Sequence, residues 1–397
     1  MPHLRLRYLQ ALLQRSQKFS PIVGIFGHRQ VGKTTLSSAL AEKYLTLDEA
    51  AVLDQATFDP KSLVRDYTAS PLVIDECQLA PPLFPVLKEW VRTHKTPGQF
   101  LLTGSVRFSS RKAIHESLTG RMVALELLPM CLSEAHGHPL SDALIRLTKS
   151  KNVEIELKKA PYFDQTVFHQ FLNQGGLPGV FAVRDAGIRR QKFETQINTL
   201  LERDLRLIIE TSLSYRSLKN LLGVLAFHQN RPLEWSEISR QTRISVPTLR
   251  KLIPAFEAMF LIRIIETEGT EKKPVLFFED QGEATYLTSN RYDDLTQITR
   301  FLFGQIRHQW AYRPETEGSL FQYRTRGGAY VPLCFRNKDG ELGILPIIEE
   351  NPNQNAMASA RSFLDAYPNS KIIFVHLGSN DQVLSARMRV LQIAQIL

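Results

Sequence analysis

Short apolar runs and stretches of helical periodicity alternate along the first third of the chain. Five apolar runs predict buried strands, at residues 21–26, 45–47, 71–74, 99–105 and 122–127. Between them, residues 36–44 and 83–91 place apolar side chains on one face of a helix. Strands that alternate with helices predict an α/β fold with a parallel sheet. Ahead of the first strand, residues 1–20 are basic, and their leucine spacing predicts a helix that packs on this sheet domain.

Helical patterns dominate the middle of the chain. The pattern weakens at residues 131–162, where we expect a mobile connection. Helices are then predicted at residues 163–172, 188–210, 218–228 and 234–242, followed by one that starts near Ser245. Strands are predicted at residues 261–265 and 275–278. The last three helices and this hairpin predict a winged helix, and Pro254 is expected to kink or shorten its third helix.

Alternation returns in the last hundred residues. Strands are predicted at residues 319–323, 330–336, 342–349 and 371–376, with a helix at 356–366. We therefore expect an N-terminal helix, a sheet domain, a linker with helical lid, a winged helix and a C-terminal α/β domain. The corresponding ranges are 1–20, 21–135, 136–215, 216–280 and 281–397.

The composition indicates a possible class of binding partner and a cellular compartment. No apolar run approaches the roughly 20 residues that a membrane span needs. Three widely separated cysteines suggest a reducing, cytoplasmic setting without disulfides. Of the net charge of +9, six charges fall in residues 181–263, which hold 14 Lys and Arg against 8 Asp and Glu. Such a balance is compatible with nucleic acid, although it is usually a solvated surface.

The turn after the first strand has the form G-x-x-x-x-G-K-T, from Gly27 to Thr34. Strand, Gly-rich turn and helix in this order indicate a phosphate-binding Walker A loop for ATP. The loop amides, those of Gln30 and Val31 included, turn inward because Gly27 and Gly32 adopt angles that other residues avoid. The alternative is a Gly-rich turn that carries a Lys and a Thr by chance.

Three side chains follow the loop's second glycine. Lys33 is expected to reach the β- and γ-phosphates, and the Thr34 hydroxyl to be a ligand of Mg²⁺. Thr35 is expected on the α-phosphate side or as a helix cap. The helices at 163–172 and 188–210 would then form a lid over the nucleotide, with Arg203 or Arg206 responding to the phosphates.

Polar residues stand at the ends of two further strands, and an arginine precedes a third. Asp75 is expected to hold the magnesium water shell and Glu76 to polarise the attacking water. Thr103 and Ser105 fall beside the γ-phosphate, because ligands collect at the carboxyl ends of parallel strands; a strand-capping turn is the alternative. Arg121 is a candidate arginine finger that contacts a phosphate in its own or a neighbouring subunit. The alternative is an ordinary surface arginine.

Six segments in order resemble a prokaryotic family of AAA+-type P-loop ATPases, related to archaeal-type and signal-transducing ATPases. They are GHRQVGKTTL, LVIDECQLAPPL, FLLTGS, SLTGR, LLPMCLSEA and QGGLPGVF, within residues 9–266. The resemblance implies an ATPase core and a C-terminal domain of unknown function. It also implies roles in nucleotide and metal binding, in catalysis and at the sensor position. These fall on Gly27, Gly32, Lys33, Thr34, Asp75, Glu76, Thr103 and Ser105.

The family's last domain is similar to a restriction endonuclease, which needs two acidic residues and a Lys around a metal. Here the corresponding stretches read Tyr330-Val331-Pro332 and Ile347-Ile348-Glu349-Glu350, with no Lys after the second. We therefore expect a structural or binding domain without nuclease activity.

Two functions follow from these features. In the first, Mg²⁺-dependent ATP hydrolysis drives a conformational switch of the winged-helix and C-terminal domains on DNA or a protein partner, helped by homo-oligomer assembly. In the second, a nucleotide-gated module binds its partner with little or no hydrolysis. DNA contact would rest on Arg243, Thr248, Arg250 and Lys251, while Glu268 and Glu271 in the wing oppose it.

Overall fold

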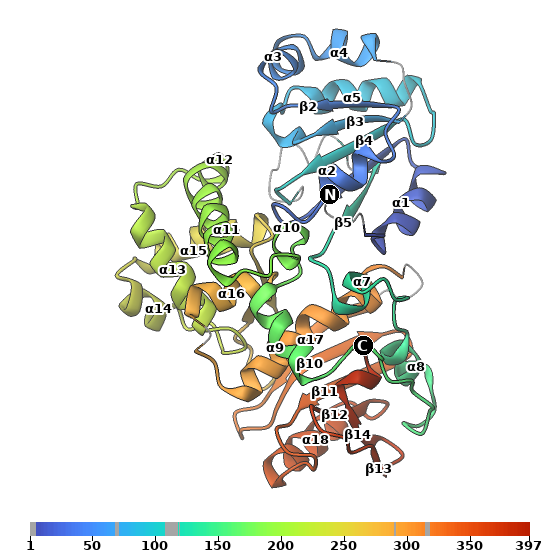
Figure 1. The fold of residues 1–397 in the computed structure, drawn as a ribbon, viewed down its shortest axis with the longest axis vertical. Coiled ribbons are helices and arrows are strands. Elements are labelled where there is room, and N and C mark those ends of the chain that lie inside the picture. The colour runs from blue at the N-terminus through green and yellow to red at the C-terminus, as the bar shows by residue number, and fades with distance from the viewer. Residues whose placement is uncertain (1–4, 68–70, 108–117, 119, 290, 314–317) are drawn as a thin grey trace.

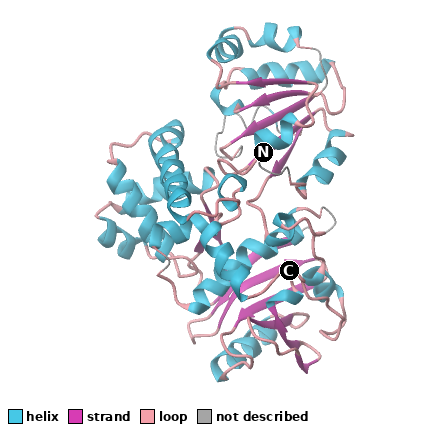
Figure 2. Ribbon diagram, in the orientation of Figure 1, coloured by secondary structure: helices cyan, strands magenta, loops and turns pink. Residues whose placement is uncertain are grey.

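The computed structural model describes residues 5–67, 71–107, 118, 120–289, 291–313 and 318–397. Two sheets lie at opposite ends of the molecule, and helices of the middle of the chain gather beside them (Figures 1 and 2). Among the described residues, none of the helices combines the length and apolar character that crossing a membrane requires.

The first sheet has five parallel strands in the order β2-β3-β4-β1-β5. The strands are β1 (Ile22–Phe26), β2 (Lys43–Thr46), β3 (Leu72–Asp75), β4 (Phe100–Gly104) and β5 (Met122–Glu126). The helices of this part are α1 (Leu9–Gln17), α2 (Lys33–Ser38), α3 (Ala50–Phe58), α4 (Pro60–Asp66) and α5 (Leu83–Thr93), with a 3-10 turn η1 (Cys77–Leu79). Buried apolar clusters cover both faces of the sheet. The predicted α/β fold with a parallel sheet is confirmed.

The helix after the glycine loop is shorter than predicted. It ends at Ser38, and β2 begins at Lys43, inside the stretch 36–44 for which a helix was expected. The hydroxyls of Ser37 and Ser38 donate to the carbonyl oxygens three residues earlier, at 3.3 Å. Such side-chain bonds compete with helical hydrogen bonds, and pairing of β2 with β3 takes over from Lys43.

The middle of the chain is mainly helical. Its elements are α9 (Gln165–Gln174), α10 (Pro178–Phe181), α11 (Ala186–Thr199), a π-helical turn η3 (Leu200–Asp204), α12 (Leu205–Ile208), α13 (Tyr215–Phe227), α14 (Trp235–Thr242), α15 (Val246–Ala258), α16 (Gln281–Thr288) and α17 (Asp294–Ala311). Strands β6 (Ile262–Ile265) and β8 (Val275–Phe278) pair antiparallel after α15. Pro254 does not end α15, which continues to Ala258.

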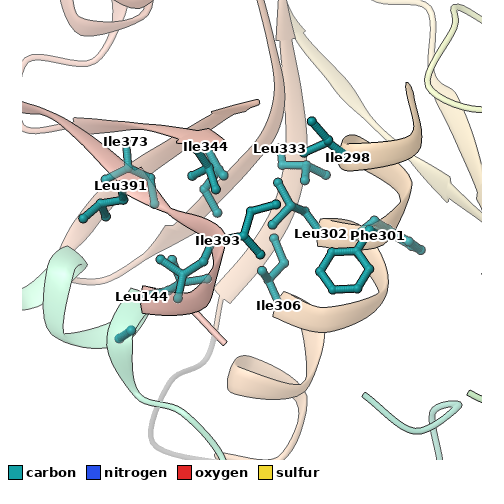
Figure 3. Close-up of a cluster of buried hydrophobic side chains, with 14 of the residues drawn as sticks. Leu144, Ile298, Phe301, Leu302, Ile306, Leu333, Ile344, Ile373, Leu391 and Ile393 are labelled. Carbon is teal, nitrogen blue, oxygen red and sulfur yellow. The ribbon is translucent and has the colours of Figure 1, made fainter. Parts of the chain in front are cut away.

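The second sheet has seven strands in the order β13-β14-β12-β11-β10-β9-β7. They are β7 (Thr267–Gly269), β9 (Gly318–Arg324), β10 (Tyr330–Asn337), β11 (Gly340–Pro346), β12 (Lys371–His376), β13 (Gln382–Ser385) and β14 (Met388–Gln392). Helix α18 (Gln354–Ala366) covers one face, and a 3-10 turn η5 (Ile393–Gln395) follows β14. Helix α17 lines the other face, where Phe301, Leu302 and Ile306 meet Leu333 and Ile344 (Figure 3).

The predicted mobile connection at residues 131–162 is wrong. This segment contains α7 (Leu132–Ala135) and α8 (Ala143–Lys149), and Leu144 of α8 is buried in the same core as α17 and the second sheet (Figure 3). Beyond α8, the Val153 amide donates to the Ala386 carbonyl at 3.0 Å. The core of the C-terminal α/β unit thus includes a stretch of chain that precedes the helical part, because the apolar side chains of α8 are buried in it.

The segment between the two hairpin strands also belongs to the second sheet. Strand β7 pairs in parallel with β9, with Thr267 opposite Gln322. Within β7, the Glu268 carboxylate pairs with Arg336 at 2.8 Å and accepts a hydrogen bond from the Tyr367 hydroxyl at 2.6 Å. This loop is therefore fixed against the C-terminal unit.

Candidate nucleotide-binding site

The glycine loop follows β1, and its backbone explains its glycines. Gly32 has a φ of 99° and Gln30 a φ of 62°, both in the left-handed region. At Gly27 a Cβ atom would lie 2.4 Å from the Leu127 carbonyl oxygen, so only glycine fits. Helix α2 starts at Lys33 directly after Gly32. The loop thus has the form of a phosphate cradle at the carboxyl edge of the sheet.

Lys33 lies over this loop and is 5% exposed. Its Nζ donates to the Gly27 and His28 carbonyl oxygens at 2.9 and 3.0 Å. Burial lowers the pKa of Lys33, although Glu76 and Asp75 oppose that shift. The ammonium group is held within the loop, where an anion bound by the loop amides would meet it.

Asp75, at the end of β3, accepts hydrogen bonds from three hydroxyl groups. Thr34 Oγ1 donates to its carboxylate at 2.9 Å, and the hydroxyls of Tyr44 and Thr103 donate to the same carboxylate. Tyr44 was not predicted as a site residue because a helix was expected there. Its position on β2, which pairs with β3, brings its hydroxyl to Asp75. Burial and the Asp75 hydrogen bond raise the pKa of Tyr44, so it remains a donor.

This donor set suits magnesium. Hydroxyl and carboxylate oxygens are the hard ligands that Mg²⁺ prefers, and the ion ordinarily completes its shell with water and phosphate oxygens. Thr34 and Asp75 supply one oxygen of each kind side by side. Within the described part of the chain, no group of three His, Cys, Asp or Glu residues forms an all-protein metal cage.

Glu76 lies beside the end of β4 in an unusual backbone conformation, with a φ of 55°. Its amide donates to Thr103 Oγ1 at 3.4 Å, and its carboxylate accepts from Ser105 Oγ at 3.2 Å and from the Gln78 amide. Gln78 was not predicted. A left-handed non-glycine residue at the end of a central strand is the kind of strain that concentrates at functional sites. The structure thus brings Asp75, Glu76, Thr103 and Ser105 together.

One predicted site residue lies away from the glycine loop. Arg121 precedes β5, whose first residue Met122 pairs with Ile22 at the start of β1, whereas the glycine loop follows the end of β1. Arg121 is therefore at the opposite edge of the sheet, and the expectation that it contacts a phosphate in its own subunit is wrong. Thr35 follows Thr34 in the first turn of α2 and does not cap that helix, so its expected place on the α-phosphate side stays a prediction.

Arg7 supports the loop from behind and was also missed. Its guanidinium donates to the Val31 and Leu128 carbonyl oxygens, both at 2.6 Å, and pairs with Glu134 at 3.0 Å. Arg7 lies just before α1, which packs on β1 and β5 as expected. A basic N-terminal segment gave no signal that one of its arginines was buried.

The glycine loop also contacts the helical part. His28 Nε2 lies 3.1 Å from the Glu283 carboxylate of α16, and both side chains are fully buried. Arg29 pairs with Asp204 of η3 at 2.9 Å. Burial disfavours the charged imidazole, but the Glu283 carboxylate raises the pKa of His28 overall. Arg203, expected as a phosphate-responsive residue, pairs with Asp48 at 2.7 Å.

A second contact joins the segment after β4 to the helical part. The Arg107 amide, two residues after Ser105, donates to the Ala258 carbonyl at 2.7 Å, where α15 ends. The Arg107 guanidinium donates to the Glu257 carbonyl at 2.9 Å and pairs with Glu126 at 3.0 Å. Arg263 and Arg307 share the Glu126 and Glu279 carboxylates. The strand beside Glu76 is thus tied to the end of α15.

A parallel sheet with a Walker A loop after β1 and an acidic pair after β3, with β4 between these two strands, defines a P-loop nucleotide-binding domain. Residues 19–136 match the family model of an AAA domain, and residues 165–294 match a domain of unknown function (DUF8612). Residues 19–136 thus belong to the AAA domain family, which confirms the resemblance to AAA+-type P-loop ATPases for this part of the chain.

Known relatives are distant. Two uncharacterized proteins, from Mycobacterium bovis and Mycobacterium tuberculosis, are each 24% identical over 280 residues. The matches cover 68% of this chain but only 57% of those proteins. A Walker-type ATPase of Pyrococcus abyssi has a TM-score of 0.42 at 15% identity, over 70% of this chain and 94% of that one. Likenesses this distant carry no argument about activity.

Proposed function

We propose that the protein binds ATP with Mg²⁺, hydrolyses it and uses the cycle as a conformational switch. The single observation that carries this proposal is that the site's own segments hold the helical part: His28 and Arg29 from the loop, and Arg107 from the end of β4. A change in nucleotide state at the loop or at β4 acts directly on these contacts.

Each site residue has a role in this proposal. Lys33 exchanges its two carbonyl partners for phosphate oxygens. Thr34 and Asp75 would hold the magnesium ion, which would supply positive charge against the phosphates. Glu76 releases its bond to Ser105 and accepts one from the attacking water, which it orients and polarises. Thr103 and Ser105 then register whether the γ-phosphate is present.

The switch would move a winged helix. Helices α13 to α15 and the antiparallel pair of β6 and β8 support that description. Its wing segment β7 is held in the second sheet, which favours the wing as a joint to the C-terminal unit rather than a DNA contact. Arg243, Arg250 and Lys251 are exposed, so the third helix remains a candidate for DNA contact. The alternative is a protein partner, and the experiment below therefore includes DNA.

The second candidate is a nucleotide-gated binding module with little hydrolysis. The observation in its favour is that the Glu76 carboxylate is engaged by Ser105 and Gln78, which compete with an attacking water. In this case ATP occupancy alone shifts the contacts of His28, Arg29 and Arg107.

Steady-state ATP hydrolysis by wild type and Glu76→Gln, with Mg²⁺ and with or without duplex DNA, separates the two. The switch predicts turnover by wild type, and ATP binding without turnover by Glu76→Gln, since the amide cannot polarise water. Glu49→Gln, on an exposed glutamate outside the site, is the matched control. Nucleotide binding by both proteins without turnover by either supports the gated module. Stimulation by DNA identifies the partner class.

A further inference from the structure

We propose that the groove between α9, α11 and α16 is a second ligand site, separate from the glycine loop, for an anion that carries a planar ring. The chemical class is that of a nucleoside monophosphate. The groove has a volume of about 400 Å³. Volumes of roughly 300 to 1,000 Å³ are typical of small-molecule sites.

The groove is positively charged. Arg189 and Arg190 of α11 line it, and none of the described residues that line it is acidic. Arg189 is oriented by a hydrogen bond from its Nη1 to the Val183 carbonyl at 2.9 Å. Arg190 is exposed and forms no ion pair with any residue that the structure describes. Two guanidinium groups without a carboxylate partner favour a phosphate or carboxylate ligand.

An aromatic wall lines the same space. Its accessible ring is that of the half-buried Tyr286, which is stacked on the buried Phe193 with centroids 6.0 Å apart. The Arg190 guanidinium lies 5.8 Å from the Tyr286 ring centroid. Lys219 donates to the Tyr286 hydroxyl at 3.3 Å and pairs with Glu194 at 3.3 Å, so it fixes the ring without adding net charge. Aromatic faces bind nucleobases by stacking, so the wall favours an anion with a ring over a bare ion.

The groove lies back to back with the nucleotide-binding loop. Gly282 lines it, and the next residue, Glu283, pairs with His28. On the opposite wall, Phe193 precedes Gln196 by one helical turn, and Gln196 donates to Glu283 at 2.8 Å. The two helices that form the groove therefore also hold the glycine loop.

AMP is the probe, because it lacks the β- and γ-phosphates that Lys33 is expected to hold. Calorimetric titration of the full chain is expected to detect AMP binding that Lys33→Ala leaves unchanged. Arg190→Glu is expected to weaken it about tenfold or more, since a charge-assisted contact becomes repulsive. Asn173→Trp, which fills the groove from its rim, should do the same. Arg216→Glu, an exposed charge reversal on α13, is the matched control.

Three results would overturn the proposal. They are no AMP binding to wild type at millimolar concentration, loss of binding in Lys33→Ala, and AMP binding that Arg190→Glu and Asn173→Trp both leave intact. Adenosine and inorganic phosphate test the two halves of the ligand. Either one binding as tightly as AMP contradicts the claim that the site recognises the ring and the anion together. Circular dichroism checks that each variant is folded.

Discussion

Asp75 shows how one carboxylate is prepared by groups that are distant in sequence. Hydroxyls reach it from the helix after the glycine loop, from β2 and from β4. Only the first and third come from motifs that sequence reasoning singles out. The remaining hydroxyl, that of Tyr44, orients Asp75 without belonging to the expected metal ligands. Such outer partners typically contribute about 10- to 100-fold to metal affinity.

We therefore expect Tyr44→Phe to raise the Mg²⁺ concentration for half-maximal ATP hydrolysis about tenfold, because Asp75 loses a donor that fixes its orientation. The measurement is a magnesium titration of steady-state hydrolysis at saturating ATP. Tyr67→Phe removes a hydroxyl from a tyrosine outside the site and serves as control. An unchanged magnesium requirement in Tyr44→Phe would contradict the role assigned to this hydroxyl.

His28 makes stability depend on pH. Burial alone would lower its pKa, but Glu283, with Asp280 nearby, raises it above the ordinary value of about 6.5. A group with a raised pKa stabilises the fold fully below its unfolded pKa, and this stabilisation is lost as the pH rises through the folded pKa. The drop in Tm caused by His28→Gln should thus be largest below about pH 6.5 and should shrink at higher pH.

Thermal unfolding across this pH range measures the effect, with the exposed His169→Gln as control. A Tm difference between wild type and His28→Gln that stays constant with pH would show that His28 contributes by packing rather than by charge.

Among the elements, α8 differs most from its expectation. Its residues Leu144 and Leu147 are fully buried between α17 and the second sheet, although their surroundings in the sequence are polar. A short amphipathic helix is hard to distinguish from a linker by periodicity alone, since its apolar residues need a partner surface from elsewhere in the chain. Strands β13 and β14 were missed for a related reason, because they pair at one edge of a sheet whose other strands precede them.

Leu144→Ala tests the place of α8. We expect it to reduce the free energy of unfolding of the C-terminal unit by about 2 to 5 kcal/mol, as large-to-small changes in a packed core do. Hydrogen exchange of peptides from β11 and β12 under native conditions reports this loss. Lys149→Ala, on an exposed position of the same helix, should change little. Equal hydrogen exchange in both variants would show that α8 acts as a linker and does not stabilise this core.

At the scale of the whole molecule, the position of Arg121 matters more than its local contacts. It lies at the sheet edge away from the glycine loop of its own chain. An arginine there contributes to hydrolysis only if it reaches the site of a second copy. The proposed role of Arg121 as an arginine finger therefore depends on the proposed homo-oligomer.

Mixing two inactive variants tests this hypothesis. Arg121→Ala and Lys33→Ala alone should each hydrolyse ATP at least about a hundredfold more slowly than wild type, given the effect of arginine fingers. Mixed in equal amounts, they should recover activity, because a chain with an intact loop receives Arg121 from its partner. Hydrolysis per chain should also rise with protein concentration. A mixture no more active than its components would exclude action between subunits.

By itself, the sequence determined the nucleotide-binding domain. Apart from β2, its strands are mainly apolar runs. The residues Gly27, Gly32, Lys33, Thr34 and Asp75 stand next to the strands that position them, so local pattern and site coincide. Only the tertiary structure decided which remote groups complete that site. Arg7, Tyr44 and Glu283 reach it through contacts between segments far apart in the chain. The same holds for the C-terminal core, which α8 joins across about 150 residues. Periodicity records which face of an element is apolar, but the partner of that face is set by packing.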